Sequence, residues 1–224
     1  MAPDKETVAY FQPGTKRRII MAAIELFAAK GYGGASMRDI AKAVDIKTAS
    51  IYSHFESKEA LLYTIYDAYE FHLAEVLPDM DKLLAELEHE DPRNVLMKST
   101  YYFSPNIQKF MGQTVAVAVY EARTDARSEE FVNKVLLEIP GSITKRLLNR
   151  LLELEYIEPL DVDAMVVLLT NYCYSAAVRD NGMHPIGIDD WVKGYTLLTT
   201  LIQPTEKGLA AASLSKQGGP TGAR

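Results

Sequence analysis

Residues 36–58 of the chain read SMRDIAKAVDIKTASIYSHFESK. Ser36 and Asp39 form a capping-box-like start for a helix. Apolar residues then recur at helical spacing, at Met37, Ile40, Ala41 and Val44. After Asp45 a second short helix is predicted through His54, with short side chains at Thr48, Ala49, Ser50 and Ser53. Two short helices joined by a tight turn are typical of a helix-turn-helix that enters the major groove of DNA, although any small helical hairpin shows similar spacing.

The flanking residues extend this helical pattern in both directions. Before it, residues 15–30 carry one apolar face and should end at Gly31; this face holds Ile20, Ala23, Ile24, Phe27 and Ala28. After it, Ser57 can cap a longer helix that Pro78 should bend or end. Further helices are predicted at residues 79–89, 92–103, 105–124, 127–155, 161–180 and 188–203. The sequence shows no hairpin dipeptide between alternating strands and no repeat of fixed period, so we predict an all-α fold.

Composition and charge narrow the class of protein. The 224 residues are 48% apolar, which is enough to fill a substantial core and excludes a disordered or fibrous protein. The net charge of −6 argues at first against nucleic acid, because phosphate binding needs Lys and Arg. Residues 1–60, however, hold nine bases and seven acids, a net of +2 that leaves −8 for the remainder. This asymmetry fits a DNA-binding head on an acidic body.

The sequence also bears on the compartment. Its longest uncharged stretch, residues 164–178, is shorter than the ~20 apolar residues of a bilayer-spanning helix. Near the start, charged residues occupy the positions where a signal peptide would have its apolar run. The single cysteine, Cys173, excludes an intrachain disulfide. We therefore expect a cytoplasmic protein that has no membrane partner.

Residues 15–63 resemble, without a gap, the amino-terminal DNA-binding domain of the TetR family of bacterial transcriptional regulators. Besides the pattern of the first helix, the shared motifs are Asp39-Ile40-Ala41, Ile51-Tyr52, His54-Phe55 and Ser57-Lys58-Glu59. The resemblance implies a homodimer whose carboxy-terminal helical domain binds a small molecule and thereby releases an operator. The family commonly has Gly where this chain has Asp45, and Ser or Thr where it has Lys47. Asp tolerates the left-handed backbone conformation better than most residues, so we expect the turn to survive.

The resemblance also implies an organisation and a function. We predict a helix-turn-helix DNA-binding domain followed by a helical ligand-binding and dimerisation domain. The boundaries are an amino-terminal arm at residues 1–12, the DNA-binding domain at 13–58, the regulatory and dimerisation domain at 59–203, and a flexible carboxy-terminal tail at 204–224. The predicted function is a repressor that a small-molecule effector releases from a double-stranded DNA operator. The alternative is a DNA-binding regulator that a protein partner controls.

Several residues of the helix-turn-helix are candidates for contact with DNA. Arg38 is long enough to reach a guanine edge, and the N–H groups at the start of its helix favour a phosphate. Thr48 is assigned to base edges, whereas the resemblance implies that Tyr52 and His54 contact phosphates. Lys58 lies in the first turn of a helix, where only a bound anion makes a cation favourable. The full set of candidates is Ser36, Arg38, Lys47, Thr48, Ser50, Tyr52, His54 and Lys58.

The carboxy-terminal helices are candidates for ligand binding and dimerisation. Their aromatic and soft side chains suit an apolar pocket with a few polar groups, although an ordinary core is an equally good reading of each residue. The predicted pocket consists of Tyr101, Tyr102, Met111, Tyr120, Met165, Asn171 and Tyr174. The last two helices carry more apolar surface than one side of a bundle requires, since Trp191 and Leu198 would otherwise face water. The predicted dimer interface consists of Leu168, Tyr172, Trp191, Tyr195 and Leu198.

Besides the two kinds of regulator, an enzyme is the third class of protein that the sequence could encode. Cys173 could pair with a histidine as nucleophile and base, but its apolar neighbours favour a buried and unreactive thiol. The four histidines are scattered, and no HxxxH or CxxC spacing appears in the sequence. We therefore expect no catalytic residue, no metal site and no cofactor.

Overall fold

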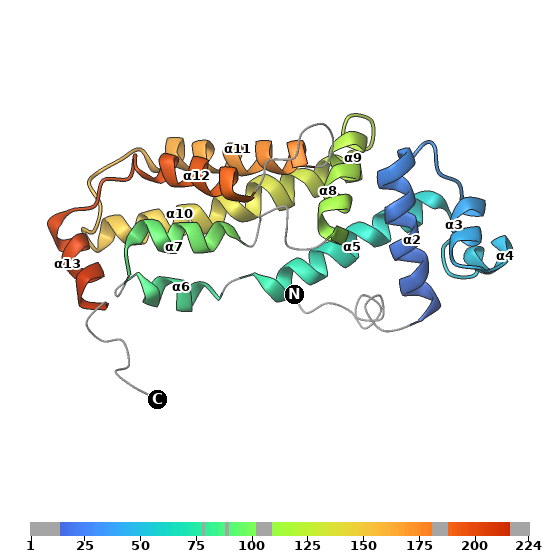
Figure 1. Cartoon of the computed structure of the whole chain (residues 1–224), viewed down its shortest axis with the longest axis horizontal. Helices are drawn as coiled ribbons and strands as arrows, with labels where there is room; N and C mark the ends of the chain where they lie inside the picture. Colours follow the sequence, from blue (N-terminus) through green and yellow to red (C-terminus); the bar gives the residue numbers. More distant parts are fainter. Residues whose placement is uncertain (1–13, 78, 88–89, 102–108, 181–187, 216–224) are drawn as a thin grey trace. The chain divides into compact units, whose positions relative to one another are not determined.

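The computed structural model describes residues 14–77, 79–87, 90–101, 109–180 and 188–215. These residues form helices, with one isolated bridge between Ile157 and Pro204 and no strand among them, so the fold is all-α (Figure 1). None of the described helices combines the length and the apolar character that crossing a bilayer requires.

Four helices form the amino-terminal region: α2 (Thr15–Lys30), α3 (Met37–Ala43), α4 (Thr48–Tyr52) and α5 (Lys58–Val76). They confirm the helices predicted there, except that α4 ends at Tyr52 and not at His54. The predicted apolar face of α2 is buried as far as Phe27, and the helix ends at Gly31 with a φ of 73° that favours glycine. Ser57 caps α5, because its hydroxyl accepts a hydrogen bond from the N–H of Ala60.

The remaining helices are α6 (Met80–Glu86), α7 (Pro92–Tyr101), α8 (Lys109–Glu121), α9 (Ala126–Asn133), α10 (Ile139–Glu153), α11 (Val162–Asp180), α12 (Ile188–Thr199) and α13 (Glu206–Ser215). The single long helix predicted over residues 127–155 is interrupted by a π-helical turn, Lys134–Glu138, between α9 and α10. Such π-helical turns are rare and occur as single turns inside α-helices, so hydrophobic spacing alone did not predict this one.

The prediction of a flexible tail from residue 204 is wrong for α13. Thr205 caps this helix, since its hydroxyl accepts a hydrogen bond from the N–H of Gly208 at 3.1 Å. Gly208 is buried against the backbone of Tyr156, where an added Cβ would lie 2.2 Å from the carbonyl oxygen. Because Gly208 has no side chain, α13 can pack closely against the backbone of Tyr156. A search for large apolar residues at helical spacing misses this kind of packing.

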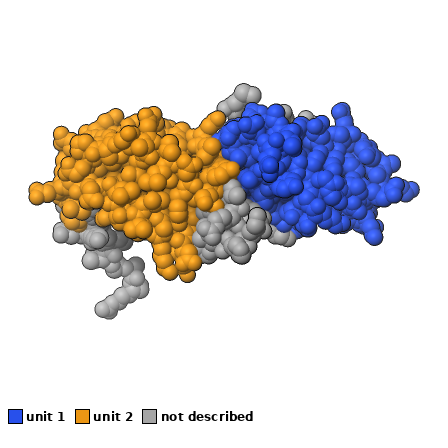
Figure 2. Space-filling model, turned by 90° about the horizontal axis from the view of Figure 1, so that it is seen from above, with its two compact units in different colours: residues 1–77, 105–135, 177–185 blue, residues 78–104, 136–176, 186–224 orange. Residues whose placement is uncertain are grey.

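The helices group into two compact units, coloured separately in Figure 2. The first comprises residues 1–77, 105–135 and 177–185, and the second comprises residues 78–104, 136–176 and 186–224. In the first unit α2 packs against α3, α5 and α8, and α8 packs against α9. In the second unit α7 packs against α6, α10 and α12. The predicted boundary between residues 58 and 59 lies at the start of α5, whereas the first unit continues to residue 77 and includes residues 105–135. The assignment of DNA binding and regulation to separate domains stays a prediction.

Candidate nucleic-acid interface

The turn between α3 and α4 has the geometry of a helix-turn-helix connection. The N–H of Asp45 donates to the carbonyl of Lys42, and the N–H of Ile46 donates to the carbonyl of Ala41. These two bonds make a Schellman motif, which needs a left-handed residue directly after the helix cap. Asp45 supplies it with a φ of 56°. The turn therefore survives the replacement of the family's usual Gly, as expected from the sequence.

Buried side chains hold the two short helices in place. Ala41 and Val44 of α3 are buried, and so are Ile51 of α4 and Phe55 after it. Ile51 and Phe55 therefore lie on the inner side of α4, away from solvent. Arg18 on α2 adds a contact that sequence reasoning missed, because its guanidinium donates to the carbonyl of Val44 at 2.6 Å. The end of α3 is thus tied to α2 within the first unit, where Figure 1 shows α3 and α4 beside each other.

Most of the predicted DNA-contact residues are exposed in the structure. The exposed ones are Ser36, Arg38, Lys47, Ser50, Tyr52 and His54, while Thr48 and Lys58 are half-buried. Tyr52 is a large aromatic side chain with 52% of its surface exposed. Within the described part of the chain, no hydrogen bond or ion pair engages the side chains of Arg38 and Lys47. Both cations are therefore available to an external anion or base edge.

Ser36 is already engaged in the cap of α3. Its hydroxyl accepts from the N–H of Asp39 at 3.2 Å and donates to the Asp39 carboxylate at 2.6 Å. The Asp39 carboxylate also accepts the N–H of Ser36 at 2.9 Å, and these bonds from Ser36 lower the pKa of the Asp39 carboxyl. A phosphate contact by the Ser36 hydroxyl would have to replace its bond to Asp39.

Lys58 connects the start of α5 to the turn that precedes α3. Its Nζ donates to the carbonyls of Tyr32 and Ala35, at 2.9 and 3.1 Å, and lies 4.2 Å from the centre of the Tyr32 ring. An ammonium has three N–H donors, so one is left for a phosphate. The structure thus gives Lys58 a positioning role in addition to the predicted DNA contact. Its side chain reaches residues more than twenty positions earlier, a link that spacing on one helix does not reveal.

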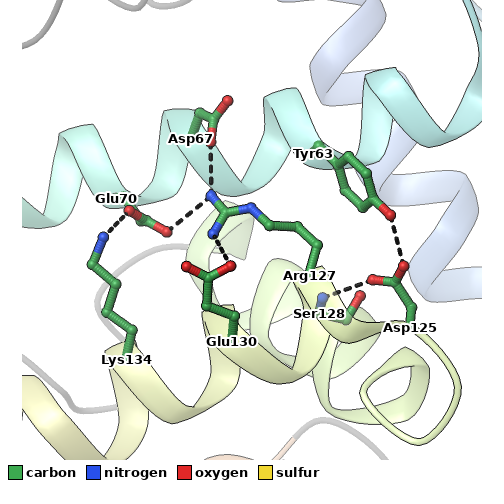
Figure 3. Close-up of polar contacts among 8 residues, drawn as sticks. All are labelled: Tyr63, Asp67, Glu70, Asp125, Arg127, Ser128, Glu130 and Lys134. Carbon is green, nitrogen blue, oxygen red and sulfur yellow. Dashed lines mark hydrogen bonds and ion pairs between the residues drawn. The ribbon is translucent and has the colours of Figure 1, made fainter.

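A line of hydrogen bonds joins α5 to the start of α9, also inside the first unit (Figure 3). The Tyr63 hydroxyl donates to the Asp125 carboxylate at 2.7 Å, and the same carboxylate accepts the N–H of Ser128 at 2.7 Å. The Ser128 hydroxyl lies 2.8 Å from the Tyr66 hydroxyl, and both groups are buried. Burial alone would raise the pKa of the Asp125 carboxyl, but the bonds from Ser128 and Tyr63 outweigh burial and lower it.

Ion pairs extend this line along α5 (Figure 3). Arg127 contacts Asp67 at 2.9 Å and Glu70 at 3.3 Å, and Lys134 pairs with Glu70 as well. Glu70 is the most buried member, with 18% of its side chain exposed. Because these groups form a network around a partly buried carboxylate, they hold α5 and α9 more firmly than isolated surface pairs would.

We expect Tyr63→Phe to lower the free energy of unfolding by about 1–2 kcal/mol, because it removes a hydrogen bond to a charged acceptor. The low pKa of Asp125 stabilises the folded state above the unfolded carboxyl's pKa, and this stabilisation is lost as the pH falls through the folded pKa. The variant should therefore lose less stability than the natural protein on acidification. Urea unfolding at several pH values measures both effects, with the exposed Tyr52→Phe as control. Equal stability of Tyr63→Phe and the natural protein would contradict the assignment.

The predicted ligand-pocket residues fall in both units. Met111 is buried and Tyr120 is exposed in the first unit, while Met165 is buried and Tyr174 half-buried in the second. The Tyr101 side chain and the whole of Tyr102 lie outside the described part of the chain. Asn171 shares an exposed face of α11 with Ala164, Val167, Leu168 and Ser175, at helical spacing. A single pocket that gathers these residues stays a prediction.

The dimer interface was predicted on the premise that Trp191 faces water in a single subunit, and this premise is wrong. Trp191 is only 2% exposed and Tyr195 is buried, because the two rings stack at 5.4 Å and Tyr172 packs beside both. The Tyr172 hydroxyl donates to the Trp191 carbonyl at 3.1 Å, and Gly194 leaves room for the Tyr172 ring. Leu198 is half-buried and Leu168 is exposed. Trp191 and Tyr195 are therefore part of the core of the second unit, and the opposite sides of α11 and α12 carry exposed residues.

Cys173 is a buried free cysteine on α11. Burial raises the pKa of the Cys173 thiol to about 12, which leaves it protonated at neutral pH. Within the described ranges, no group of three or more His, Cys, Asp or Glu side chains is placed to hold a metal ion.

Comparison with known proteins matches the amino-terminal region. Residues 19–64 match the bacterial regulatory proteins of the tetR family. IcaR of Staphylococcus aureus, the negative transcriptional regulator of the biofilm operon icaADBC, is 54% identical over 46 residues, which are 20% of this chain and 25% of that protein. The HTH-type transcriptional regulator YerO of Bacillus subtilis is 36% identical over 83 residues, 37% of this chain and 28% of that protein. The chain thus spans about a quarter of the length of the curated relatives it matches.

Solved structures share the fold over most of the chain. A transcriptional regulator from Saccharomonospora viridis in complex with choline superposes with a TM-score of 0.66 at 18% identity, covering 85% of this chain and 97% of that one. The ketosteroid transcriptional regulator KstR2 of Mycobacterium tuberculosis gives 0.63 at 19% identity, with the same coverage of 85% and 97%. At such low identity these likenesses show the fold alone.

Proposed function

Because the chain belongs to the TetR family of bacterial regulatory proteins, we propose that it is a transcriptional repressor that binds a double-stranded operator as a homodimer and is released by a small-molecule effector. The observation that carries DNA binding is the α3–α4 pair, with its left-handed turn at Asp45 and its buried inner face. Arg38 and Lys47 are exposed on this pair and, within the described ranges, have no side-chain hydrogen bond or ion pair. Similarity to IcaR, a negative regulator, supports repression.

Each exposed residue takes a role in this proposal. Arg38 and Thr48 read base edges, whereas Tyr52, His54 and Lys58 contact phosphates. Ser36, Lys47 and Ser50 complete the surface at the starts of α3 and α4. A dimer places two such surfaces on one duplex, so the operator is nearly palindromic, with half-sites about one helical turn or a small multiple apart.

The outward sides of α11 and α12 support dimerisation. Large apolar side chains are exposed there, namely Val167, Leu168, Val192, Leu197 and Leu201, which we call the α11–α12 apolar surface. Pairing this surface with its copy in a second subunit removes it from water. Of the interface residues predicted from sequence, Leu168 belongs to this surface and Leu198 lies at its border.

The effector part of the proposal rests on the family and on the fold, since one protein of similar structure was solved with a bound small molecule. A gel-shift assay on the DNA upstream of the gene, with and without cell extract, tests the whole proposal. We expect a shift that extract reverses, with the releasing activity passing a filter that retains proteins. A releasing activity that the filter retains and protease destroys would favour control by a protein partner. No shift at low salt would contradict DNA binding altogether.

Lys58→Met tests the proposed phosphate contact and the positioning role together. Loss of one charge contact in each subunit should lower the slope of log affinity against log salt by roughly two, at ~0.9 per phosphate, on every sequence alike. Loss of the bonds to Tyr32 and Ala35 should cost about 1–2 kcal/mol of unfolding free energy. Titrations across a salt series and urea unfolding give the two readouts. An unchanged slope with reduced stability would leave Lys58 with the positioning role alone.

A further inference from the structure

A cavity of 180 Å³ lies between the end of α2 and α8, inside the first unit. Its walls come from two segments: Phe27, Ala28, Gly31 and Tyr32 on one side, and Ala116, Val117, Tyr120 and Glu121 on the other. None of the residues assigned to DNA lines it, and Tyr120 is the only one of its residues that the sequence-based pocket included. Ala28, expected in the core from its spacing, is exposed at this cavity.

Aromatic rings make up much of the wall. Phe27 and Tyr32 meet edge to face, with ring centres 5.2 Å apart, and Tyr120 is 73% exposed although it is a large aromatic side chain. The faces of such rings attract cations. The Tyr32 ring already has one cation near it, because the Lys58 ammonium lies 4.2 Å from its centre.

The carboxylate of Glu121 completes the cavity. Glu121 is half-buried, and within the described ranges no hydrogen bond or ion pair engages its side-chain oxygens. Burial raises the pKa of this carboxyl, the nearby Asp125 charge raises it further, and the Lys58 charge acts in the opposite sense. In addition to the Lys58 charge, a cation beside Glu121 would therefore stabilise the ionised side chain.

We propose that this cavity binds a small organic ammonium ion. The charged nitrogen lies against the Glu121 carboxylate and the faces of Tyr32 and Tyr120, and the apolar part packs on Phe27 and Val117. The volume is below the ~300–1,000 Å³ of sites for drug-sized ligands, so the occupant is a compact amine or the amine end of a longer molecule.

Both walls of the cavity connect to the helices that carry and support the DNA-contact residues. The Glu121 carbonyl accepts the N–H groups of Thr124 and Asp125, at 3.0 and 2.9 Å, and the Asp125 carboxylate holds Tyr63 on α5. On the other wall, Tyr32 belongs to the turn that leads into α3 and that Lys58 holds. An occupant that separates the walls would displace α3 relative to α5. This effect on DNA binding rests on the proposed function, whereas the binding of the ammonium ion does not.

Calorimetric titration of the full chain tests the site, with phenethylammonium as the charged probe and 2-phenylethanol as its neutral analogue. We expect the natural protein to bind the charged probe at least about tenfold more tightly than the analogue. Glu121→Gln keeps the shape, removes the charge and should weaken the charged probe about tenfold. Ala28→Leu fills the cavity from an exposed position and should weaken both compounds. The matched control Glu129→Gln removes an exposed carboxylate of α9 and should bind as the natural protein does.

Absence of binding by the natural protein would overturn the proposal, and so would equal binding by Glu121→Gln, by Ala28→Leu or of the neutral analogue. Circular dichroism confirms that each variant is folded. A second titration, of operator DNA with and without the charged probe, keeps the two proposals apart. If the protein binds the probe but no operator, the proposed function fails and the site stands. If it binds the operator but Glu121→Gln takes up the probe unchanged, the site fails and the proposed function stands.

Discussion

Leu197→Glu is expected to turn the protein into a monomer and to abolish specific binding to its operator. Leu197 is 69% exposed on α12 and belongs to the α11–α12 apolar surface. In the proposed dimer the substitution buries a carboxylate from each subunit without a partner, which costs several kcal/mol. A single helix-turn-helix then contacts only one half-site, so most of the affinity is lost.

Sedimentation velocity and operator titration measure the two effects. Leu168→Glu places the same charge on α11 and should act in the same way. Leu209→Glu is the matched control, because Leu209 is an exposed leucine on α13 and outside the proposed surface. A dimer that persists in both Leu197→Glu and Leu168→Glu would refute this interface. A monomer in Leu209→Glu would show that the interface includes α13.

Arg38→Ala is expected to weaken operator binding by about 1–3 kcal/mol per half-site and to relax preference at one position in each. Arg38 is exposed in the first turn of α3 and has no side-chain hydrogen bond or ion pair among the described residues. Its guanidinium is therefore available to donate hydrogen bonds to a guanine edge. Its removal should leave folding unchanged, because no side-chain hydrogen bond or ion pair among the described residues is lost. Titrations on the operator and on scrambled DNA measure the specific and the non-specific part separately.

Lys42→Ala is the control for this experiment, since it removes another exposed cation from the same helix. We expect it to weaken both DNAs alike through phosphate contacts. If Arg38→Ala also loses affinity equally on operator and scrambled DNA, Arg38 has a phosphate role and the base reading assigned to it is wrong.

The helix-turn-helix could be predicted from the sequence because its determinants are local. Ser36 and Asp39 cap α3 within four residues, and Ile51 and Phe55 are buried on one side of α4, as their spacing indicates. The left-handed turn followed from the tolerance of Asp45 for a positive φ. Each of these inferences needs only one helix and its nearest neighbours, which is the range over which periodicity and capping carry information.

The rest depends on contacts between segments far apart in the sequence. Spacing marks two apolar sides of α12, one with Trp191 and one with Leu197, and only the packing of Tyr172 and Trp191 shows which side is inside. The spacing of residues on a single helix cannot show the Lys58 bonds to the α2–α3 turn, nor the cavity that Glu121 lines. α13 was not predicted from the sequence, because it packs through close backbone contact at Gly208 and not through a large side chain.

Footprinting of the DNA upstream of the gene tests DNA binding, the central claim, most directly. The account predicts one saturable protected site with approximate two-fold symmetry, whose protection Arg38→Ala weakens and Leu197→Glu abolishes while circular dichroism shows both variants folded. Protection that covers the fragment uniformly, or that both folded variants reproduce unchanged, would contradict it.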